Sequence, residues 1–297
     1  MSTRKDLVSI GMPVYNGELY LEAAIRSNLD QTYSNLELII ADNASTDRTE
    51  EIGRSFAAAD SRVTYHRHER NIGAAKNYNR LHELSKGEYF RWSNADDLVK
   101  PQLIERTLPI LRSRSDVVIA YGRTQLIDAN GKMLENYDDN LDIQDNDTCR
   151  RYSEFYRRVG LTNIIYGLMR SSAMKETQLM GDGQLPASDI SFMASMILRG
   201  KFVEVPEQLF FRRMHEGAFS AMTTPTDQQQ FWRASGTAVA LPHCRAALTD
   251  LKAIVSSPLP LREKLALSAF SAKRLHWHRR ILATDFLNLL SARSKPK

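Results

Sequence analysis

Long hydrophobic runs are missing from this sequence, and cysteine is scarce. No apolar stretch approaches the roughly 20 residues that a helix needs to cross a bilayer, so no membrane-spanning segment is expected. The polar residues Met1–Asp6 lead directly into a short apolar segment, and we therefore expect no secretory signal. Cys149 and Cys244 are the only cysteines and lie far apart in the sequence. A disulfide framework is thereby disfavoured, and a cytoplasmic location, where thiols stay reduced, is predicted.

The common phosphate-binding fingerprints are also absent. The sequence contains no G-x-x-x-x-G-K-[ST] loop and no G-x-G-x-x-G after a predicted strand, which disfavours P-loop NTPases and nicotinamide-dependent enzymes. It has no internal repeat and no low-complexity tract. What remains is an ordinary globular composition, with 42% hydrophobic and 25% charged residues in a chain of 297. This length predicts one large domain, or one domain with an appendage, around a substantial core.

The excess of positive charge is confined to the C-terminal part of the chain. The formal net charge is +5, yet Leu251–Lys297 contains ten Lys or Arg residues and two acidic residues, a net +8, so the preceding 250 residues carry −3. No basic patch with interleaved aromatic residues occurs in those 250 residues. The pattern therefore disfavours nucleic acid as a partner of the main body.

Short apolar segments alternate with helical patterns over the first 120 residues, which is typical of βαβ units and a mostly parallel sheet. The expected strands are Leu7–Gly11, Leu36–Ala41, Val63–His66, Glu88–Trp92 and Val117–Tyr121. The expected helices are Glu18–Leu29, Asp47–Phe56, Gly73–Leu84 and Pro101–Leu111, with Asp47 and Glu50 as a predicted capping box. The fold class is therefore predicted to be α/β.

The regular alternation of strand and helix patterns ends after residue 121. A hairpin signal, Asn130-Gly131, separates two short strand patterns, Thr124–Asp128 and Lys132–Glu135. The acidic stretch Asn136–Thr148 is expected to be a surface loop. Two more helices, two more strands and a linker are expected at Tyr152–Val159, Ser188–Leu198, Phe202–Val205, Leu209–Arg213 and Met222–Asp227. Gln228–Leu290 has a helical pattern with breaks at Pro242 and Ser256–Pro260, so we expect an α/β domain over residues 1–222 and a helical, basic C-terminal segment over residues 223–297.

Three polar clusters follow strands of the predicted sheet. Pro13–Gly17 follows the first strand, Asp42–Asp47 the second, and Asn94–Asp97 the fourth. Ligands of open α/β sheets bind at the carboxyl ends of parallel strands, and the topology would bring all three clusters to one rim. Taken singly, each cluster has a plainer interpretation as a turn, a helix cap or a loop.

Asp96 and Asp97 suggest the chemistry of this rim. Adjacent carboxylates repel each other unless a cation lies nearby. Mg²⁺ is commonly shared between one or two carboxylates and the phosphates of a substrate. The pair therefore predicts a divalent cation and a substrate that carries a diphosphate.

Six segments of the chain resemble inverting glycosyltransferase family 2, whose catalytic domain has the GT-A fold. They read VSIGMPVYNG, LELIIADNASTDRTEEI, RNIGAAKNYNR, GEYFRWSNADDLVKP, SDISFMASMILRG and EQLFFRRMH, in the family's order and spacing over roughly Leu7–His215. The resemblance implies a Rossmann-like, mostly parallel sheet flanked by helices. It also implies a nucleotide-sugar donor, UDP-linked by preference, and Mn²⁺ or Mg²⁺ as the cofactor.

The resemblance further implies a nucleotide pocket along the first three segments. Its expected residues are Pro13, Tyr15, Asn16, Asp42, Ser45, Asp47, Gly73 and Asn77. In this scheme Tyr15 lies against the base, Asp42 accepts a hydrogen bond from the pyrimidine N3–H, and Gly73 and Asn77 pass beside ribose and phosphate. Gly73 also has a physical reason, because a side chain at the helix start would obstruct a close ligand. Asp42 suits uracil and thymine alike, which leaves UDP and dTDP donors open.

The D-x-D motif of the family is altered in this chain. It reads Asn94-Ala95-Asp96, followed by Asp97. The resemblance places Asn94 and Ala95 beside the nucleotide, Asp96 on the metal ion and Asp97 on the donor diphosphate. An amide cannot supply the charge of a carboxylate, so a metal ion that needed both acids would bind more weakly here. The alternative is a motif that no longer binds a metal ion.

An inverting transfer needs a base that deprotonates the acceptor hydroxyl while it attacks from the side opposite the diphosphate. The family places this acid at the start of a helix beyond the sheet, and the match here is Asp189. It follows Ser188, where relatives usually have another acid. The alternative is that Asp189 only caps the following helix. Asp182, between Gly181 and Gly183, is the second candidate.

The segment that ends in Arg212, Arg213 and His215 is expected beside the diphosphate. In some relatives a histidine here completes the metal site, and imidazole is an acceptable ligand of Mn²⁺. An isolated histidine at a strand end could equally be a surface residue. Either arginine could bind the diphosphate through paired hydrogen bonds, but only one of two neighbours in a strand can face the site.

We therefore predict the transfer of one sugar to a hydroxyl of a glycan or lipid-linked acceptor, in surface polysaccharide or glycolipid assembly. The Q-x-x-R-W signature of processive synthases is absent, which favours single addition. One rival is a catalytically degenerate protein that binds a nucleotide or glycan without turnover. Another is a sugar-nucleotide pyrophosphorylase, which would need a Gly-rich basic loop that Pro13–Gly17 does not supply.

The basic tail leaves two interpretations open. Leu261–Leu290 mixes apolar residues with Lys and Arg, as in an amphipathic helix that lies on anionic lipid, here at the inner face of the plasma membrane. The alternative is a helical subdomain that packs against the catalytic domain or against a second subunit in a homodimer.

Overall fold

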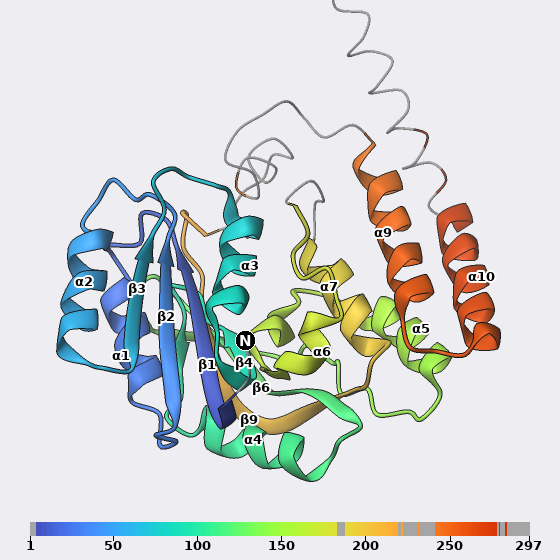
Figure 1. The fold of residues 1–297 in the computed structure, drawn as a ribbon, viewed down its shortest axis with the longest axis horizontal. Helices are drawn as coiled ribbons and strands as arrows, with labels where there is room; N and C mark the ends of the chain where they lie inside the picture. Colours follow the sequence, from blue (N-terminus) through green and yellow to red (C-terminus); the bar gives the residue numbers. More distant parts are fainter. Residues whose placement is uncertain are drawn as a thin grey trace, which may run out of the picture.

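The computed structural model describes residues 4–182, 188–218 and 241–277 and the single positions 221, 231, 279 and 283. A layered α/β body forms one side of the molecule, and helices from the second half of the chain lie beside it (Figure 1). The α/β fold class is confirmed. The predicted linker Met222–Asp227 and the predicted boundary between residues 222 and 223 lie outside the described residues.

Strands and helices alternate in the N-terminal half as predicted. The strands are β1 (Arg4–Val14), β2 (Leu36–Asp42), β3 (Val63–Arg67) and β4 (Gly87–Trp92), and the helices are α1 (Leu21–Leu29), α2 (Thr49–Ala59), α3 (Ala74–Leu84) and α4 (Leu103–Ser113). β1 pairs in parallel with β2 and β4, and β2 pairs in parallel with β3. The nearly continuous burial of β2 is what a strand covered on both faces requires.

The chain beyond β4 completes one mixed sheet. It adds β5 (Leu98–Val99), β6 (Val117–Ile127), β7 (Met133–Tyr137), β8 (Leu168–Arg170) and β9 (Lys201–Arg213). The strand order is β3-β2-β1-β4-β8-β6-β9-β5, and β7 pairs with β6 outside this path. β8 is antiparallel to β4 and β6, whereas β9 is parallel to β6. β5 and β8 were not predicted, since strands this short leave no periodic pattern.

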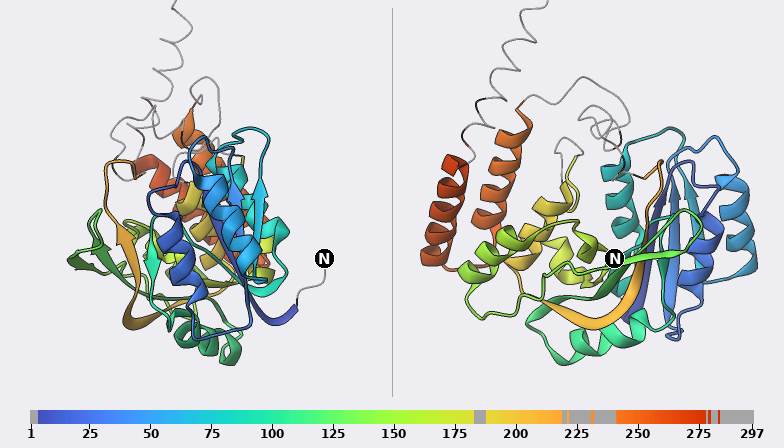
Figure 2. Two further views of the ribbon diagram at one scale, coloured as in Figure 1. Left: turned by 90° about the vertical axis from the view of Figure 1, so that its left-hand side faces the viewer. Right: turned by 180° about the vertical axis from the view of Figure 1, so that it is seen from behind.

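β9 corrects the prediction of two strands in this region. Phe202–Val205 and Leu209–Arg213 belong to one strand that follows β6 along its length. The register shifts between the Gly122–Val205 and Arg123–Gln208 pairs, so Pro206 and Glu207 lie in a bulge. Proline cannot donate a ladder hydrogen bond, and the bulge accommodates it without ending the strand. β9 therefore runs from the helical half to the β1–β4 half of the molecule (Figure 2).

Two local predictions are wrong. The stretch Asn136–Thr148 is not simply a surface loop, because Leu141 and Ile143 are fully buried and Ile143 forms a β-bridge with Phe202. The capping box is also absent, since α2 begins at Thr49 with no side-chain cap. Glu50 instead forms ion pairs with Arg54 and Arg67.

Apolar side chains fill both faces of the sheet. One core cluster lies against α3, α5 (Thr148–Arg158) and α7 (Ser188–Ile197), and includes Leu81, Phe90, Trp92, Phe155 and Phe192. The other lies against α1 and α4, and includes Leu21, Ile25, Ile104 and Leu108. Each such side chain contributes about 1.5–3 kcal/mol to folding. The remaining short elements, η1 (Asn163–Tyr166) and α6 (Ser171–Lys175), flank β8.

The C-terminal segment forms a helical hairpin, α9 (Pro242–Ser256) and α10 (Leu261–Trp277), with the predicted break between the two helices. α9 packs against α7, and α10 packs against α9 and α5. At this interface the buried carboxylate of Asp250 accepts hydrogen bonds from Tyr156 (2.6 Å) and Arg274 (3.1 Å). Among the described residues, no helix combines the length and apolarity that crossing a membrane requires.

Candidate active site

The carboxyl ends of β1, β2 and β4 lie along one rim, so the three polar clusters meet as predicted. Val14 at the end of β1 pairs with Asp42 at the end of β2. The Asn16 N–H donates to Ser45 Oγ (2.9 Å), and the Thr46 N–H donates to Asn16 Oδ1 (2.8 Å). A Cβ atom on Gly17 would lie only 3.6 Å from Cβ of Ala95 in the third cluster. The first cluster therefore contacts both of the others.

Tyr15 is the part of this rim that faces outward. Tyr15 is 51% exposed, which leaves the face of an aromatic ring accessible at the rim. Pro13, one strand position inside the rim, pairs with Ala41. Asn16 has φ of 52°, in the left-handed region that asparagine tolerates better than most residues. This turn directs Tyr15 to the surface and Asn16 Oδ1 toward Thr46.

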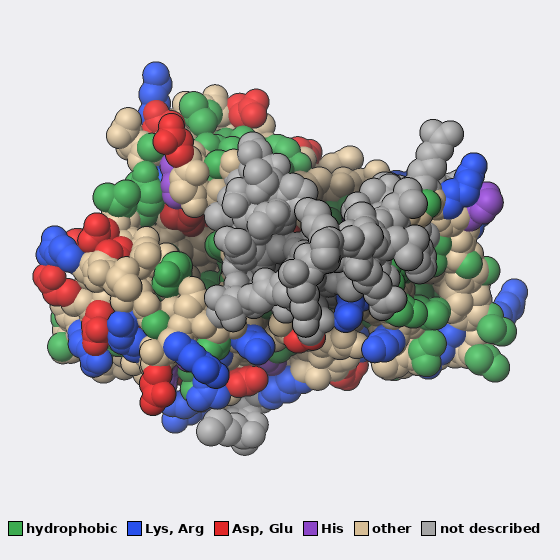
Figure 3. All heavy atoms as spheres, turned by 90° about the horizontal axis from the view of Figure 1, so that it is seen from above, with side chains coloured by type: hydrophobic (Ala, Val, Ile, Leu, Met, Phe, Trp, Pro, Cys, Tyr) green, Lys and Arg blue, Asp and Glu red, His purple; other side chains and the backbone are tan. Residues whose placement is uncertain are grey.

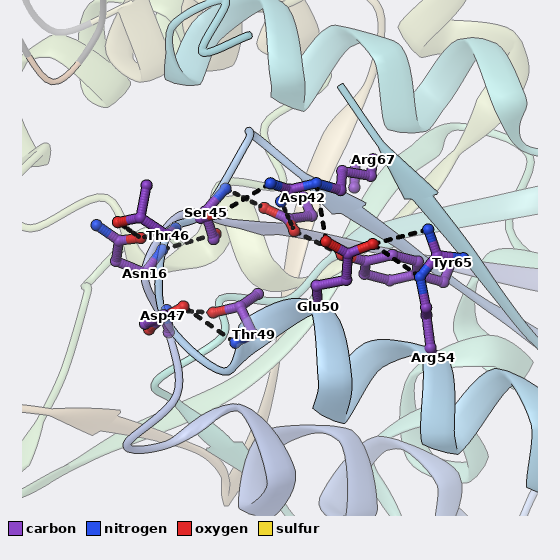
Figure 4. Close-up of polar contacts among 12 residues, drawn as sticks. Asn16, Asp42, Ser45, Thr46, Asp47, Thr49, Glu50, Arg54, Tyr65 and Arg67 are labelled. Atoms are coloured by element: carbon purple, nitrogen blue, oxygen red, sulfur yellow. Dashed lines mark hydrogen bonds and ion pairs between the residues drawn. The ribbon is translucent and has the colours of Figure 1, made fainter. Parts of the chain in front are cut away.

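Asp42 lies beneath the rim, fully buried among protein donors (Figure 4). Its carboxylate accepts hydrogen bonds from the Ser45 N–H (2.8 Å), the Tyr65 hydroxyl (2.5 Å) and Arg67 Nη1 (2.7 Å). Burial and the Asp42 charge raise the pKa of Tyr65 well above its usual value. A pyrimidine N3–H would have to displace one of these donors to reach Asp42. Tyr65 and Arg67 were not identified from the sequence, although polar residues at the end of β3 could have indicated partners for Asp42.

Ser45 and Asp47 also bond within the protein rather than facing outward. Ser45 is buried, and its carbonyl accepts a hydrogen bond from Arg67 Nη2 (2.9 Å). Asp47 accepts hydrogen bonds from the N–H groups of Glu18 and Thr49. Partial burial opposes the change, but these bonds and the Thr49 hydroxyl lower the pKa of Asp47. Both residues shape the loop that bears the outer surface of the pocket.

The start of α3 joins the same rim. Gly73 precedes the helix with φ of 85°, a conformation that L side chains rarely adopt, so the backbone itself requires glycine. Asn77 is buried, and its predicted position beside the ligand stays a prediction. Its amide donates to the Ala41 carbonyl (2.8 Å), and its Oδ1 lies 3.0 Å from His68 Nε2. Asn77 therefore fixes α3 to the end of β2.

Asp96 and His215 meet at the rim although 119 positions separate them in the sequence. Asp96 Oδ2 lies 3.0 Å from His215 Nε2, and the side chain of Asp96 is 31% exposed. The His215 ring packs on Tyr20, with 4.9 Å between ring centroids. One carboxylate oxygen and one imidazole nitrogen thus lie side by side, next to a surface that a ligand can reach.

Asp97 lies on the inner side of the motif, only 2% exposed. Its oxygens accept hydrogen bonds from the Arg213 N–H (2.8 Å) and Asn94 Nδ2 (3.0 Å). Burial, together with the charge of Asp96, raises the pKa of Asp97 to about 7. In this arrangement the carboxyl group supports the rim from below, and its predicted contact with the donor diphosphate stays a prediction.

Asn94 is fixed in a network that explains the altered motif. Its Oδ1 accepts a hydrogen bond from the Tyr78 hydroxyl (2.6 Å), and its amide also donates to the Tyr166 oxygen (2.7 Å). An aspartate here would place a second carboxylate against buried Asp97. Like charges at this distance repel strongly in a buried environment, so the amide is the compatible side chain.

Arg212 and Arg213 point in different directions, as neighbours in a strand must. Arg213 is buried, donates to the Asp96 carbonyl (2.8 Å), and lies over Tyr20 at 4.6 Å from the ring centroid. Arg213 therefore supports the motif through its backbone, and its predicted contact with the diphosphate stays a prediction. Arg212 donates to Asn163 Oδ1 (2.6 Å), and its charge acts on both Asp97 and Asp189.

Asp189 lies at the start of α7 on the Arg212 side of the site. Burial raises the pKa of Asp189, although hydrogen bonds from the Ile190 N–H and the Thr162 hydroxyl, and the charge of Arg212, act in the opposite direction. Thr162 has φ of 61°, a strained conformation for a β-branched residue and one that is concentrated at functional sites. Asp182, the second candidate for the base, lies on the exposed surface.

A further buried acid, Asp139, was missed because it lies in the stretch expected to be a loop. It accepts hydrogen bonds from the Thr124 hydroxyl (3.1 Å) and the Asn163 N–H (3.0 Å). Burial raises the pKa of Asp139 to about 6, while the charge of Arg212 lowers it. Arg212 is therefore the cation shared by several buried acids, and only its position in the fold reveals this.

The donor set at the rim fits a divalent metal ion in part. Among the described residues, no group of three His, Cys, Asp or Glu side chains could bind a metal ion without other ligands. Asp96 and His215 supply one oxygen and one nitrogen. Mn²⁺ accepts both kinds of ligand, and substrate phosphates and water commonly complete such a coordination shell.

Comparisons with known proteins agree with this arrangement. Residues 9–174 match the family model described as glycosyl transferase family 2. An uncharacterized glycosyltransferase of Rickettsia bellii is 38% identical over 135 residues, which are 45% of this chain and 19% of that protein. The glycosyltransferase GlyG of Streptococcus pneumoniae is 37% identical over 115 residues, 38% of each protein. The matches thus span less than half the length of these relatives.

Solved structures show the same fold. The crystal structure of S. aureus TarS residues 1–349 in complex with UDP-GlcNAc has a TM-score of 0.65 over 90% of this chain and 72% of that one, at 16% identity. The complex of the same protein with UDP has a TM-score of 0.64 at 13% identity. The GT-A-type α/β sheet with flanking helices is thereby confirmed. The family model covers more than half of the 297 residues, and the chain belongs to glycosyl transferase family 2.

Proposed function

We propose that this protein transfers one sugar from a nucleotide-diphosphate donor to a hydroxyl group of a glycan or lipid-linked acceptor, with inversion at the anomeric carbon. The observation that supports it most directly is the convergence of Asp96 and His215 at the carboxyl rim, 3.0 Å apart and open to a ligand. The exposed ring of Tyr15 on the same rim supplies a surface for a base. The assembly of surface polysaccharide or glycolipid is the proposed setting.

UDP is the proposed nucleotide. The chain shares its fold with TarS, whose structures were solved with UDP and UDP-GlcNAc. Hydrogen bonds join the loop that carries Asn16 to the loop that carries Ser45 and Asp47, so the two loops form one connected surface on the rim. Asp96 and His215 are the residues that would bind Mn²⁺ or Mg²⁺. When bound, such an ion neutralises the charge that develops on the departing diphosphate.

Asp189 is the proposed general base. Its carboxylate takes the proton of the acceptor hydroxyl as the oxygen forms a bond to the anomeric carbon, and the bond from that carbon to the diphosphate oxygen breaks with its electron pair. Burial raises the pKa of Asp189, and a carboxylate with a higher pKa is a stronger proton acceptor. The Thr162 hydroxyl and the charge of Arg212 oppose this rise in the pKa of Asp189 and favour its ionised form.

A thermal-shift experiment tests the donor site. The nucleotides UDP, dTDP, GDP and CMP are each added with and without Mn²⁺ to the wild type, to Asp96→Ala and to Asp30→Ala, whose exposed carboxylate lies away from the rim. A nucleotide at about 100 times its Kd stabilises the fold by about 2.7 kcal/mol, which such an assay resolves.

We expect UDP to give the largest shift, dependent on Mn²⁺, abolished in Asp96→Ala and kept in Asp30→Ala. No shift with any nucleotide would contradict the proposal and favour the catalytically degenerate alternative, for which glycans would be the ligands to test. A shift without slow donor hydrolysis would favour a nucleotide-binding protein that lacks turnover.

The tail hairpin is the proposed contact with a membrane. Its packing on α5 and α7 agrees with the subdomain interpretation, yet its outer side exposes apolar and basic residues together, namely Leu248, Leu251, Val255, Leu261, Leu265, Lys252 and Arg262. Figure 3 shows hydrophobic and basic side chains interspersed at this end of the molecule. Such a surface suits the inner face of the plasma membrane, where anionic lipid and lipid-linked acceptors occur.

Co-sedimentation with phosphatidylglycerol vesicles tests this contact. We expect salt-sensitive binding by the wild type, its loss in Leu251→Glu/Val255→Glu, and its retention in Met133→Glu/Leu134→Glu, which changes two exposed residues of β7. If the tail variant instead dissociates a dimer seen by size-exclusion chromatography, with no vesicle binding by the wild type, the surface is a homodimer interface.

A further inference from the structure

A pocket lies between the start of α7 and the middle of α9. It is lined by residues 176–181, which follow α6, by Ser188, Ser191, Phe192 and Ser195 of α7, and by Thr249, Ala253 and Ser256 of α9. Every one of these residues lies beyond position 174, where the match to the family model ends. The pocket is therefore built from the part of the chain that this match does not cover.

The chemistry of the lining is polar but carries no positive charge. Six of the lining side chains bear hydroxyl groups, and none is Lys, Arg or His. The single acid, Glu176, already lies 3.4 Å from Arg199 in an ion pair. Phosphate and nucleotide ligands, which need cationic or clustered N–H donors, do not suit such a lining. A neutral ligand rich in hydroxyl groups does.

Ser188 marks the polar floor of the pocket. It is only 2% exposed, and its hydroxyl has no hydrogen-bond partner in the part of the chain that the structure describes. A buried hydroxyl without a partner destabilises a fold by about 1–3 kcal/mol, so such groups are generally explained by a ligand or an ordered water. Glu176, Gln178 and Ser256, all exposed, form the rim around it.

The pocket adjoins the proposed general base. Ser188 and Asp189 are consecutive at the start of α7, yet only Ser188 lines the pocket, while Asp189 lies near Thr162 and Arg212. α7 and α9 pack directly against each other and so form two adjoining walls of the pocket. A ligand in the pocket would therefore lie at the same end of α7 as the carboxylate that accepts the proton.

We propose that this pocket binds a neutral glycosyl unit of the acceptor, next to the unit whose hydroxyl reacts. The assignment of the sugar to the acceptor rests on the proposed transferase function, whereas the binding of a neutral sugar does not. It gives α9 of the C-terminal segment a part in substrate recognition. The tail hairpin then selects the acceptor, while the rim of the sheet binds the donor.

Methyl-¹³C methionine NMR on the full chain tests the proposal, because Met180 lies buried in the lining and reports on its occupancy. The Met180 resonance is assigned with Met180→Leu. The probes are the methyl glycosides of glucose, galactose, mannose, rhamnose and N-acetylglucosamine, with methyl phosphate as the charged comparison. Ser256→Trp covers the mouth of the pocket, and Val255→Trp places the same ring on the neighbouring exposed position outside it.

We expect at least one glycoside to shift the Met180 resonance, in the wild type and Val255→Trp but not in Ser256→Trp, with no response to methyl phosphate. Ser188→Ala should fold normally, since the hydroxyl has no partner, and weaken the binding of that glycoside about tenfold. No shift with any glycoside, or a shift that persists in Ser256→Trp, would overturn the proposal. UDP-sugar hydrolysis without an acceptor is measured in parallel and tests the proposed function alone. A failure of the proposed transferase function can therefore be distinguished from a failure of the proposed sugar pocket.

Discussion

At the scale of single residues, Asn94 illustrates how one buried carboxylate constrains its neighbours. Its amide bridges Tyr78, Tyr166 and Asp97 inside the rim. The family's usual acid at this position would therefore face Asp97 across about the length of a hydrogen bond. In the proposed function Asp96 and His215 are the residues that would bind the metal ion, whereas Asn94 belongs to the hydrogen-bond network beneath them.

Restoring that acid should destabilise the protein in a pH-dependent way. The pKa of Asp97 is raised to about 7, so the folded state binds its proton more tightly than the unfolded state does, and this contribution to stability is lost as pH rises toward 7. In Asn94→Asp the two acids share one proton at pH 5 but both ionise at pH 8. We expect a loss of about 2 kcal/mol at pH 8 and a smaller loss at pH 5, by urea denaturation.

The matched control is Asn35→Asp, which adds the same charge at an exposed position before β2. It should change the free energy of unfolding by less than about 0.5 kcal/mol at either pH. Equal losses at both pH values in Asn94→Asp would show that the added charge does not couple to Asp97.

The choice between Asp189 and Asp182 as the base has a kinetic signature. Asp189→Asn should lower the rate of transfer by a factor of about 10²–10⁴ without weakening donor binding, because general base catalysis is lost. Asp182→Asn, on the exposed surface, should leave the rate nearly unchanged. Burial raises the pKa of Asp189, so the wild-type rate should rise with pH through a value above that of an ordinary aspartate. A large loss of rate in Asp182→Asn, with little change in Asp189→Asn, would instead assign the base to Asp182.

At the scale of elements, an ion pair joins the ends of β2 and β3. Asp42 ends β2 without any exposure, and Arg67 at the end of β3 provides its cation. Arg67→Met would leave this carboxylate buried and unpaired, and we expect a loss of about 3 kcal/mol in the free energy of unfolding. Arg54→Met, which removes an exposed ion pair with Glu50, should lose less than about 1 kcal/mol. Thermal melts of Arg67→Met and Arg54→Met compare their losses of stability. Equal losses would mean that Asp42 is stabilised by another donor when Arg67 is absent.

The elements also show which features the sequence could predict. Apolar periodicity located β1, β2, β3 and the helices between them, because each is long enough to repeat its pattern. It could not locate β5 or β8, which are only two and three residues long and are stabilised by neighbours that are distant in sequence. The same limit applies to the site. Tyr15 is exposed at the rim, whereas Asp97 and Asn77 are buried because of contacts that no local pattern encodes.

At the scale of the whole molecule, a buried polar cluster lies at the junction between the tail hairpin and the α/β body, beside apolar contacts such as those of Ile254 and Leu267. Asp250 accepts hydrogen bonds from Tyr156 and Arg274, and the Arg274 guanidinium lies 3.4 Å from the Tyr156 ring centroid. The basic composition of this segment led to membrane and subdomain interpretations alike. The packing on α5 and α7 shows which face of the hairpin is covered, which charge and periodicity alone do not reveal.

Asp250→Ala should loosen this junction. It leaves the Arg274 charge without its acid and the Tyr156 hydroxyl without its acceptor, and breaking a buried pair of this kind destabilises by about 3 kcal/mol. Hydrogen exchange should then accelerate in Leu261–Trp277 but not in β1 or β4. Asp116→Ala, which removes an exposed acid of another ion pair, is the control. Uniform acceleration across the whole chain would show that tail and body unfold as one cooperative unit.

The self-contained bonding of the rim has a consequence for selectivity. Asp42, Ser45, Asp47 and Asn77 satisfy one another and their neighbours before any ligand arrives. Enzymes reject an analogue most strongly when it leaves a buried polar group of the site unpaired, and shape alone distinguishes related molecules by about 10- to 200-fold. The polar groups of this rim bond to one another, so a change of the donor's base leaves none of them unpaired. Discrimination between uracil and thymine donors should therefore be modest, and the stricter choice should fall on the acceptor.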